Sequence, residues 1–419
     1  MPKQIVLLTE QFPWGVGEEF IENELPYLSG LRFIFSSGDR ATTKRCVPDG
    51  VNCYGNPKPP ARSLLYAMKT VFNTLNKRSF YAELSSLLKS KRLNITTLLH
   101  LIYFIGSSAI DAKYIRKQLH LCGITSGSAI VFYSYWLYTQ AYTACLLRKW
   151  FPNSTAISRA HGFDVYEFRN KRNNLPMRKY LFENLDAVYP VSEDGKKYIE
   201  GKYEFQPRIL KVKRLGTRDY GFKEKIRNDC FRIVTCSYIF PLKRLHLLIE
   251  ALSKTPDLPL EWIHFGDGEL YDEIKMLADR SLKQNITYTF MGQVPNSDLM
   301  SWYQENDCHL FINVSETEGC PVSIMEALSF GIPLIVCDSG GSGETVENGK
   351  NGILLDKYFE LEALVDAITK FYYMAKTNTA EYDAFRKSAR EYWSDNFRAE
   401  RTYTAFKEEI LALEGNGAS

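Results

Sequence analysis

Signs of disulfides, membrane-spanning segments and strong net charge are all missing from this sequence of 419 residues. Its nine cysteines are an odd number and include no Cys-x-x-Cys pair, so we expect reduced thiols in a cytosolic compartment. No apolar run approaches the ~18 residues needed to cross a bilayer, and the run that begins at Gln4 is too short for a signal peptide. The net charge of +3 gives no reason to expect a nucleic-acid partner. These absences predict a cytoplasmic protein, either soluble or bound to a membrane surface.

The residues that are present indicate two α/β domains. At roughly 100–200 residues per domain the length corresponds to two or three domains, and the apolar content of 45% is enough for full cores. Short apolar runs alternate with segments of helical length, which is typical of parallel sheets covered by helices. The expected strands are 4–8, 32–35, 129–133, 155–158 and 187–191, followed by 232–236, 261–265, 286–290, 309–314, 334–337 and 352–355. The charged, turn-rich stretch 201–229 separates the two series and is the expected linker.

One segment, 311–355, predicts chemistry as well as fold. Its pattern is strand, loop, helix and strand, and open α/β folds bind ligands where such loops leave the carboxyl ends of parallel strands. Pro321 suits the first helical position because its missing N–H costs nothing there, and Gly331 suits a left-handed helix cap. The N–H groups from Cys320 to Ser323 then point from the helix start toward the loop, where they favour an anion such as a diphosphate.

Two glutamates lie eight positions apart in this segment. Glu326 lies in the expected helix, where its carboxylate can accept hydrogen bonds from sugar or ribose hydroxyls. Glu318 lies in the loop and can reach a second sugar. An alternative remains open, because carboxylates near helix starts are common for dipole reasons alone and the other glutamate can belong to a solvated face.

The residues around the two glutamates extend this pattern. The segment reads Glu318-Gly319-x-Pro-x-x-x-x-Glu326-Ala327, then Gly331-x-Pro333, then Gly340-Gly341-x-x-Glu344 and Asn351-Gly352. It resembles the E-x7-E motif of the family 4 retaining glycosyltransferases, which are nucleotide-sugar-dependent enzymes of the GT-B fold. The resemblance implies two Rossmann-like domains that face each other across a cleft. It implies an acceptor-side domain over 1–205, a nucleotide-sugar domain over 206–395, and a C-terminal helix over 396–419 that crosses back to the first domain.

The resemblance also implies a reaction. A sugar would move from a UDP- or GDP-sugar to a hydroxyl of a glycan or lipid-linked acceptor, with retention of anomeric configuration, in surface polysaccharide biosynthesis. Glu326 would hold the ribose and Glu318 the donor sugar. The backbone that would accompany Glu318 around the sugar and diphosphate is that of Gly319, Cys320, Pro321, Val322 and Ser323.

In the first half, two further segments match the family. Gly17, in the loop after the first strand, matches the loop under the donor phosphates and beside the acceptor, although this chain has Val16 where relatives often carry a glycine. His161 ends a strand in the sequence His161-Gly-Phe-Asp164 and would contact the transferred sugar, with Asp164 on the acceptor side. A plain turn and a structural histidine remain the alternatives.

Charge builds on the leaving diphosphate in the transition state, so the site needs cations. Lys243 matches the lysine of the family, whereas Tyr238 stands where an arginine is usual, and Arg244 is the neighbouring residue that would compensate. The alternative for Lys243 and Arg244 is a solvated helix start. Gly266 and Gly292 resemble segments that line the nucleotide pocket and border the base.

We expect neither a metal nor a cofactor besides the donor. The sequence contains no Asp-x-Asp, the carboxylate pair with which metal-dependent transferases of another fold hold a cation on the diphosphate, and its Cys and His spacing suggests no zinc site. Two other functions remain open. One is a different enzyme of the same fold, such as a phosphorylase or a sugar-nucleotide epimerase. The other is a non-catalytic nucleotide-sugar-binding scaffold, for which Tyr238 is the hint.

The donor chemistry leaves the segment 61–120 unexplained. It contains ten Lys or Arg residues against Glu83 and Asp111, interleaved with apolar residues. Basic amphipathic helices are typical of membrane surfaces and anionic partners. We therefore expect this segment to dock on an anionic membrane, with the solvated face of an ordinary domain as the alternative.

Overall fold

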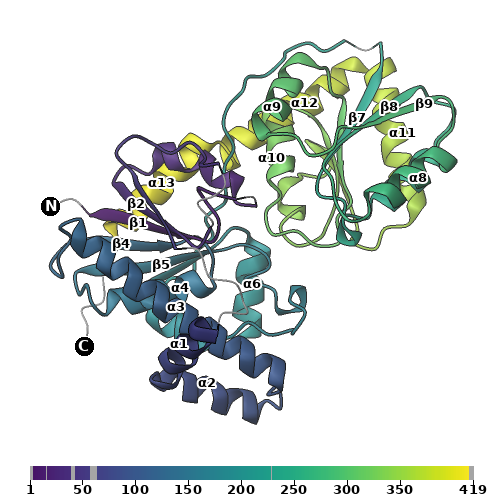
Figure 1. The fold of residues 1–419 in the computed structure, drawn as a ribbon. Helices are drawn as coiled ribbons and strands as arrows, with labels where there is room; N and C mark the ends of the chain where they lie inside the picture. The colour runs from purple at the N-terminus through teal and green to yellow at the C-terminus, as the bar shows by residue number, and fades with distance from the viewer. Residues whose placement is uncertain (1–2, 16, 39–42, 57–63, 228, 415–419) are drawn as a thin grey trace. The chain divides into compact units, whose positions relative to one another are not determined.

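The chain forms two compact units (Figure 1). The computed structural model describes residues 3–15, 17–38, 43–56, 64–227 and 229–414, so Val16 and Arg62, which the sequence analysis drew on, lie outside the described residues. Unit 1 comprises Met1–Lys213 and Tyr403–Ser419, and unit 2 comprises Arg214–Thr402. Two six-stranded parallel sheets, one in each unit, confirm the predicted α/β fold.

Unit 1 contains a sheet in the order β3-β2-β1-β4-β5-β6. Strand β1 (Gln4–Thr9) lies in the middle of this sheet and is buried on both faces. This is expected when helices cover a parallel sheet on both sides. Val6 and Leu8 belong to a core with helices α3 and α4, whereas Ile5 and Leu7 belong to a second core on the opposite face. The strands are β1 (Gln4–Thr9), β2 (Leu31–Ser36), β3 (Asn52–Gly55), β4 (Ile130–Ser134), β5 (Ser154–Ala160) and β6 (Ala187–Pro190). The α-helices are α1 (Leu64–Leu75), α2 (Arg78–Lys89), α3 (Ile95–Leu121), α4 (Thr139–Arg148), α5 (Arg178–Asn184), α6 (Glu193–Lys202) and, from Tyr403 on, α13 (Ala399–Ala412).

The last helix, α13, completes the second core of unit 1. Phe406 and Ile410 are fully buried there, beside Ile5 and Leu7. Beneath the helix lies Arg159, also fully buried, with its guanidinium 4.1 Å from the ring centroid of Phe406. Its charge is compensated inside the core: Glu24 lies 3.3 Å away, and the Tyr133 hydroxyl accepts a hydrogen bond from Arg159 Nε at 2.6 Å. A buried cation needs such partners.

Unit 1 also extends past residue 205. The N–H of Val188 in β6 donates to the carbonyl of Ile209 at 2.8 Å, and the N–H of Lys213 donates to the carbonyl of Pro190 at 2.9 Å. These bonds attach the segment after residue 205 to the sheet edge, so the boundary between the units falls at Lys213, inside the expected linker 201–229 and after the expected domain end at residue 205.

Helix α3 is long and apolar enough to cross a membrane by length and composition, although its apolar residues form no continuous run of that length in the sequence. Half of its most apolar window is buried inside the protein. Leu101, Phe104, Ile105 and Ala109 lie in the core of unit 1. Helix α3 is therefore a core helix of unit 1.

Unit 2 has a sheet in the order β12-β11-β10-β7-β8-β9. The chain runs outward from β7 to β9 and then returns to β10 on the other side of β7, so the order reverses between β7 and β10. Open α/β folds bind ligands outside the carboxyl ends of the strands at such a switch point. The strands are β7 (Phe231–Cys236), β8 (Leu260–Phe265), β9 (Ile286–Phe290), β10 (Leu310–Asn313), β11 (Leu334–Cys337) and β12 (Gly352–Leu355). The α-helices are α7 (Leu245–Lys254), α8 (Tyr271–Ser281), α9 (Asn296–Glu305), α10 (Val322–Ser329), α11 (Leu361–Thr377) and α12 (Thr379–Asn396).

Candidate active site

A cavity of about 260 Å³ lies at the switch point of unit 2. It opens between the carboxyl ends of β7 and β10 and is bounded by the first turn of α7. Lys243 is the basic residue of its wall, and polar groups make up much of the rest. The lining residues are Thr235, Cys236, Ser237, Lys243, Leu245, Leu248, Ile312, Asn313, Val314 and Ser315.

Lys243 and Glu318, both singled out from sequence, are brought together beside this cavity. Lys243 Nζ lies 2.6 Å from Glu318 Oε1, and the Glu318 side chain is about 10% exposed. Lys243 ends a single 3-10 turn, Pro241–Lys243, and Glu318 lies in the loop between β10 and α10. A donor phosphate that binds here would meet a lysine already oriented by a carboxylate.

The backbone of Glu318 is held by the two glycines after β11. Gly340 pairs with Glu318 in an isolated bridge, and the N–H of Gly341 donates to the Glu318 carbonyl at 3.1 Å. Gly340 has a φ of +61°, and a Cβ on it would lie 2.3 Å from the carbonyl oxygen of Glu318. A glycine is required here both for the left-handed backbone and for the close approach.

Glu326 lies in α10 and is 5% exposed. Its Oε1 accepts a hydrogen bond from Asn296 Nδ2 at 2.7 Å. Burial raises the pKa of Glu326 to about 7, although the hydrogen bond from Asn296 acts in the opposite direction. Asn296 begins α9 and was missed by sequence reasoning, because nothing in its local pattern shows that it reaches a glutamate thirty residues further on.

The start of α10 has the arrangement of an anion site. The N–H groups of Ile324 and Met325 both bond to the carbonyl of Pro321, so the N–H groups of Val322 and Ser323 precede the first bond of the helix. Helix N-termini favour negative charge for this reason. Pro321 is the N-cap residue, with φ −74° and ψ 107°, one position before the helical position expected for it. Gly331 has a φ of +69° after the helix, as predicted.

Arg244 lies next to Lys243 but points elsewhere. Its Nε donates to the carbonyl of Val314 at 2.6 Å, and its Nη1 donates to the carbonyl of Lys357 at 3.1 Å. A contact with a phosphate would require these bonds to break. In the structure, Arg244 therefore binds the backbone at the end of β10. This differs from the phosphate contact expected for it.

Tyr238 lies in the loop after β7, is 43% exposed, and stacks on Phe240 with ring centroids 5.7 Å apart. It adds no positive charge at the position where the family has an arginine. Gly266 and Gly292 meet at the neighbouring strand ends, since the N–H of Gly266 donates to the carbonyl of Gly292 at 2.9 Å. A Cβ on Gly266 would lie 1.9 Å from the carbonyl oxygen of Ser237, so this glycine lets the loops after β7 and β8 touch.

In unit 1, backbone groups of the loop that contains Gly17 surround the side chain of Glu18. The buried carboxylate of Glu18 accepts hydrogen bonds from the backbone N–H groups of Gln11 at 2.5 Å and Phe12 at 2.6 Å. The indole of Trp136 donates to the same carboxylate. Burial raises the pKa of Glu18 even though these bonds oppose it. Gly17 has a φ of +97°, and the side chain of Glu18, which the sequence analysis did not single out, holds the loop.

His161 follows β5 and lies among aromatic rings. Its ring centroid is 4.6 Å from that of Trp136 and 5.0 Å from that of Tyr135. Its backbone N–H donates to Asp164 Oδ1 at 2.8 Å, and Asp164 Oδ2 accepts from the N–H of Leu137 at 2.8 Å. Burial raises the pKa of Asp164, but hydrogen bonds and the charge interaction with His161 outweigh it and lower the pKa. Asp164 therefore positions His161.

Trp136 joins the two predicted sites of unit 1, because it contacts both the Glu18 carboxylate and the His161 ring. The predicted residues thus form two groups. One lies in unit 1 and contains Gly17 and His161. The other lies in unit 2 around Lys243 and Glu318, with Glu326 in the helix that follows.

The chain was compared with family models, with curated proteins and with solved structures. Residues 217–392 match the family model described as Glycosyl transferases group 1. The chain is 29% identical over 181 residues to the O-antigen biosynthesis glycosyltransferase WbnH of Escherichia coli, a match that covers 43% of this chain and 49% of that protein. The chain thus spans about half the length of this curated relative.

Solved structures resemble the whole chain. A glycosyltransferase from Rickettsia africae has a TM-score of 0.68 at 18% identity, covering 98% of this chain and 100% of that one. Alr3699/HepE of Anabaena in complex with UDP has a TM-score of 0.67 at 16% identity, with the same coverage. These similarities confirm the predicted GT-B fold of two Rossmann-like domains.

Proposed function

We propose, from the match of residues 217–392 to the Glycosyl transferases group 1 model, that the chain is a retaining, metal-independent glycosyltransferase. It moves a sugar from a UDP- or GDP-sugar to a hydroxyl of a glycan or lipid-linked acceptor, in surface polysaccharide biosynthesis. The observation that carries the proposal is the pairing of Lys243 with Glu318 at 2.6 Å beside the cavity at the switch point. The name of the WbnH relative and the UDP complex of HepE support the acceptor pathway and the donor class.

The chemistry follows from what each group can stabilise. The leaving diphosphate gains negative charge as its bond to the sugar breaks, and Lys243 with the N-terminus of α10 offers positive charge to it. Glu326 accepts hydrogen bonds from the ribose, and Glu318 contacts the donor sugar. His161 is proposed to contact the transferred sugar.

Retention follows if the acceptor attacks the face that the diphosphate leaves. The departing phosphate oxygen takes the proton of the acceptor hydroxyl, the new glycosidic bond forms to the anomeric carbon, and the bond to the diphosphate breaks. Neither Lys243 nor His161 is needed as a nucleophile in this scheme. The phosphate charge is carried by Lys243 and backbone N–H groups, so no metal ion and no further cofactor are required.

A donor screen tests the proposal. Purified protein is incubated with UDP- and GDP-sugars in the presence of EDTA, and transfer to water or to simple glycosides is followed by nucleotide release. The anomeric configuration of the product is then read by NMR. We expect turnover in EDTA with retention. Loss of activity in EDTA, or an inverted product, would contradict the mechanism.

A second candidate function is a non-catalytic nucleotide-sugar-binding scaffold. The observation that favours it is Tyr238, which supplies no cation where the family has an arginine, together with Arg244, whose side chain is bonded to backbone carbonyls. Donor binding without transfer or hydrolysis in the same screen would favour the scaffold over the enzyme.

We further propose that unit 1 docks on the cytoplasmic face of an anionic membrane, where a lipid-linked acceptor is presented. Helix α1 supports this, because an apolar stripe of Leu65, Met68, Phe72 and Leu75 is 48–66% exposed. Its opposite face, with Thr70 and Thr74, is buried, so the helix turns its small polar face inward and its apolar face outward. An amphipathic helix with this exposure is suited to the lipid interface.

Basic residues accompany the stripe. Lys69 lies within α1, Lys77 caps the start of α2, and Arg78 is the first residue of α2. These positive charges complement an anionic lipid surface. Flotation with vesicles of phosphatidylcholine alone or with one-third phosphatidylglycerol tests the docking. We expect recovery with the anionic vesicles, reduced by salt and abolished by Leu65→Gln with Phe72→Gln. Equal recovery with both vesicle types would refute the electrostatic part.

A further inference from the structure

Glu344 belongs to the motif around the two glutamates but has no part in the proposed reaction. It lies in the single 3-10 turn Gly343–Thr345, which follows β11 and the two glycines that hold Glu318. Its Oε2 lies 3.0 Å from Arg214 Nη2. The side chains of Arg214 and Glu344 are 29% and 20% exposed, so water screens this ion pair less than it screens a pair on an open surface.

The loop that contains this turn is bonded internally between β11 and β12. Asn351, which is fully buried, donates from Nδ2 to the carbonyl of Thr345 at 3.1 Å and accepts the N–H of Glu347 at 2.8 Å. The Thr345 hydroxyl donates to the carbonyl of Ser342 at 2.6 Å, and the Ser342 hydroxyl donates to the carbonyl of Cys337 at 3.0 Å. These bonds make the loop one connected body.

The same loop holds the backbone of Glu318. Gly340 forms the isolated bridge with Glu318, and the N–H of Gly341 donates to the Glu318 carbonyl at 3.1 Å. The Ser339 hydroxyl donates to the carbonyl of Ser315 at 2.6 Å, which fixes the start of the loop that carries Glu318. A displacement of the turn would therefore move the backbone from which the Glu318 carboxylate extends.

The other partner, Arg214, extends from a fixed segment. Arg214 is the first residue of unit 2. Shortly after it, the N–H of Thr217 donates to the carbonyl of Phe397 at 2.8 Å, and the N–H of Ala399 donates to the carbonyl of Thr217 at 3.0 Å. Trp393 Nε1 donates to the Thr217 hydroxyl at 2.8 Å. The ion pair thus joins this anchored segment of unit 2 to the loop that holds Glu318.

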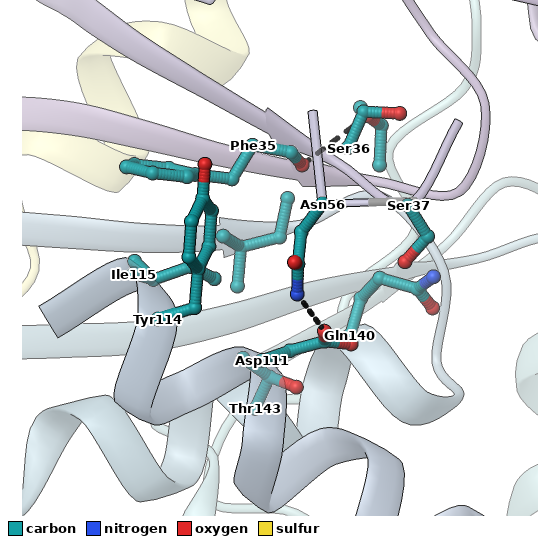
Figure 2. A pocket seen from close by; sticks show the side chains of 11 residues that line it. Phe35, Ser36, Ser37, Asn56, Asp111, Tyr114, Ile115, Gln140 and Thr143 are labelled. Carbon is teal, nitrogen blue, oxygen red and sulfur yellow. Dashed lines mark hydrogen bonds between the residues drawn. The ribbon is translucent and has the colours of Figure 1, made fainter. Parts of the chain in front are cut away.

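Unit 1 has a comparable tie at the carboxyl edge of its own sheet. Asn56 Nδ2 donates to Asp111 Oδ1 at 2.7 Å and joins the end of β3 to α3 (Figure 2). That tie involves a neutral amide. The tie in unit 2 instead joins two opposite charges and ends on the loop that holds Glu318. Loss of the Asn56 tie is therefore a suitable comparison for loss of the Arg214 tie.

We propose that Arg214 and Glu344 are positioning residues, which through the loop between β11 and β12 set the place at which Glu318 meets the donor sugar. The contact of Glu318 with a sugar rests on the proposed glycosyltransferase function. The coupling of Arg214 to the Glu318 backbone does not, because it follows from the bonds within unit 2. The coupling cannot exceed the energy of the ion pair, which for a partly exposed pair corresponds to at most about fivefold in an equilibrium constant.

The experiment has two independent arms. In the first, hydrogen exchange followed by mass spectrometry reports the protection of segment 338–346, which includes the Gly341 N–H, in the full-length protein without ligand. In the second, titration calorimetry measures the Kd of UDP, GDP, UDP-glucose, UDP-N-acetylglucosamine and GDP-mannose. The ratio of the Kd of the nucleotide to that of its sugar derivative reports the sugar contact, because the base and diphosphate are common to both.

Three variants test the ion pair. Arg214→Gln breaks it, Arg214→Glu places two carboxylates together, and Arg214→Glu with Glu344→Arg restores opposite charges in reversed order. Two variants are controls. Arg227→Gln breaks an ion pair of 3.2 Å with Asp307 before the amino ends of β7 and β10, and Asn56→Ala breaks the tie in unit 1.

We expect Arg214→Gln to speed exchange of segment 338–346 about two- to fivefold and to weaken the best-bound nucleotide sugar by a similar factor. The Kd of the corresponding nucleotide should change less than about twofold. Arg214→Glu should have the larger effect, since like charges repel, and the reversed pair should return both quantities toward the wild type. The controls should change neither quantity. Thermal unfolding at the wild-type temperature shows that the variants are folded.

The outcomes separate the coupling from the proposed function. Faster exchange in the Arg214 variants, with no nucleotide sugar bound by any protein, supports the coupling and refutes the proposed function. Turnover with wild-type exchange and an unchanged Kd ratio in every variant refutes the coupling and leaves the proposed function standing. Equal weakening of nucleotide and nucleotide sugar, or no recovery in the reversed pair, refutes the positioning role.

Discussion

The ionised carboxylate of Glu326 should lower the stability of unit 2 but strengthen donor binding. The variant Glu326→Gln separates these two effects. Burial raises the pKa of Glu326 from 4.5 to about 7, so the folded protein keeps a proton that the unfolded chain releases as the pH rises. Stability is therefore unaffected by this group below about pH 4.5, falls between about pH 4.5 and 7, and carries the full cost above pH 7. A shift of this size corresponds to about 3 kcal/mol.

Glutamine cannot ionise, so the variant escapes this cost while it can still accept the hydrogen bond from Asn296. We expect its free energy of unfolding to exceed that of the wild type by up to about 3 kcal/mol at pH 8, and by little at pH 5. For a unit of this size each kcal/mol corresponds to about 2–4 °C. The melting temperature of unit 2 should therefore rise by several degrees at pH 8.

Donor binding should change in the other direction. An ionised carboxylate that accepts ribose hydroxyls contributes about 1.5–3 kcal/mol, so Glu326→Gln should weaken the binding of a UDP-sugar about 10- to 100-fold at pH 8. In the wild type, affinity should fall about tenfold from pH 8 to pH 6 as Glu326 becomes protonated. An intact nucleotide sugar is the suitable probe, because its diphosphate does not titrate in this range.

Calorimetry measures both quantities: scanning calorimetry at pH 5, 6, 7 and 8, and titration with the best-binding UDP- or GDP-sugar. The transition of unit 2 is the one that the donor raises. Glu305→Gln is the matched control, because Glu305 is an exposed glutamate of the same unit and should change neither quantity. Unchanged donor affinity in Glu326→Gln would refute the ribose contact, and a stability difference independent of pH would refute the role of burial.

Three further predictions concern other parts of the site. Lys243→Met should lower kcat about 10²- to 10³-fold, because it removes positive charge from the leaving diphosphate; steady-state kinetics measures this, and an unchanged kcat would place the diphosphate elsewhere. Gly340→Ala should destabilise unit 2 by at least about 1–2 kcal/mol, since alanine is strained at a positive φ and its Cβ would collide with the Glu318 carbonyl; a melting temperature equal to that of the wild type would contradict it. Asp164→Asn should lower stability by about 1–3 kcal/mol, because one amide oxygen cannot replace both carboxylate oxygens that accept N–H groups; denaturant unfolding measures the loss, and the NMR chemical shifts of His161 should also change.

The sequence predicts the strands well where they are apolar and buried. All strands of both sheets except β3 were expected, and their bounds differ by one or two residues at most from those observed. Strand β3 reads Asn-Cys-Tyr-Gly, has little apolar content, and lies at a sheet edge. Its structure depends on its pairing with β2, and such a tertiary contact leaves no alternation of apolar and polar residues in the sequence.

The site was predictable where a local pattern carries it. The loop of Glu318, the helix of Glu326 and the left-handed Gly331 follow from local preferences and from the resemblance. The hydrogen bonds of Arg244, the Asn296 partner of Glu326 and the winding of a loop around Glu18 depend on side chains that meet only in the folded chain.

Helix α13 has a consequence for the order in which the protein can be made. Phe406 and Ile410 complete the second core of unit 1 and cover the buried Arg159, yet they leave the ribosome about 190 residues after Lys213. Unit 2 is contiguous and can fold as soon as it emerges, whereas the first-made unit must wait with an uncovered apolar face until synthesis is nearly finished. During that interval the nascent chain exposes the surface that α13 later covers, which is the period when a chaperone or premature aggregation would act on it.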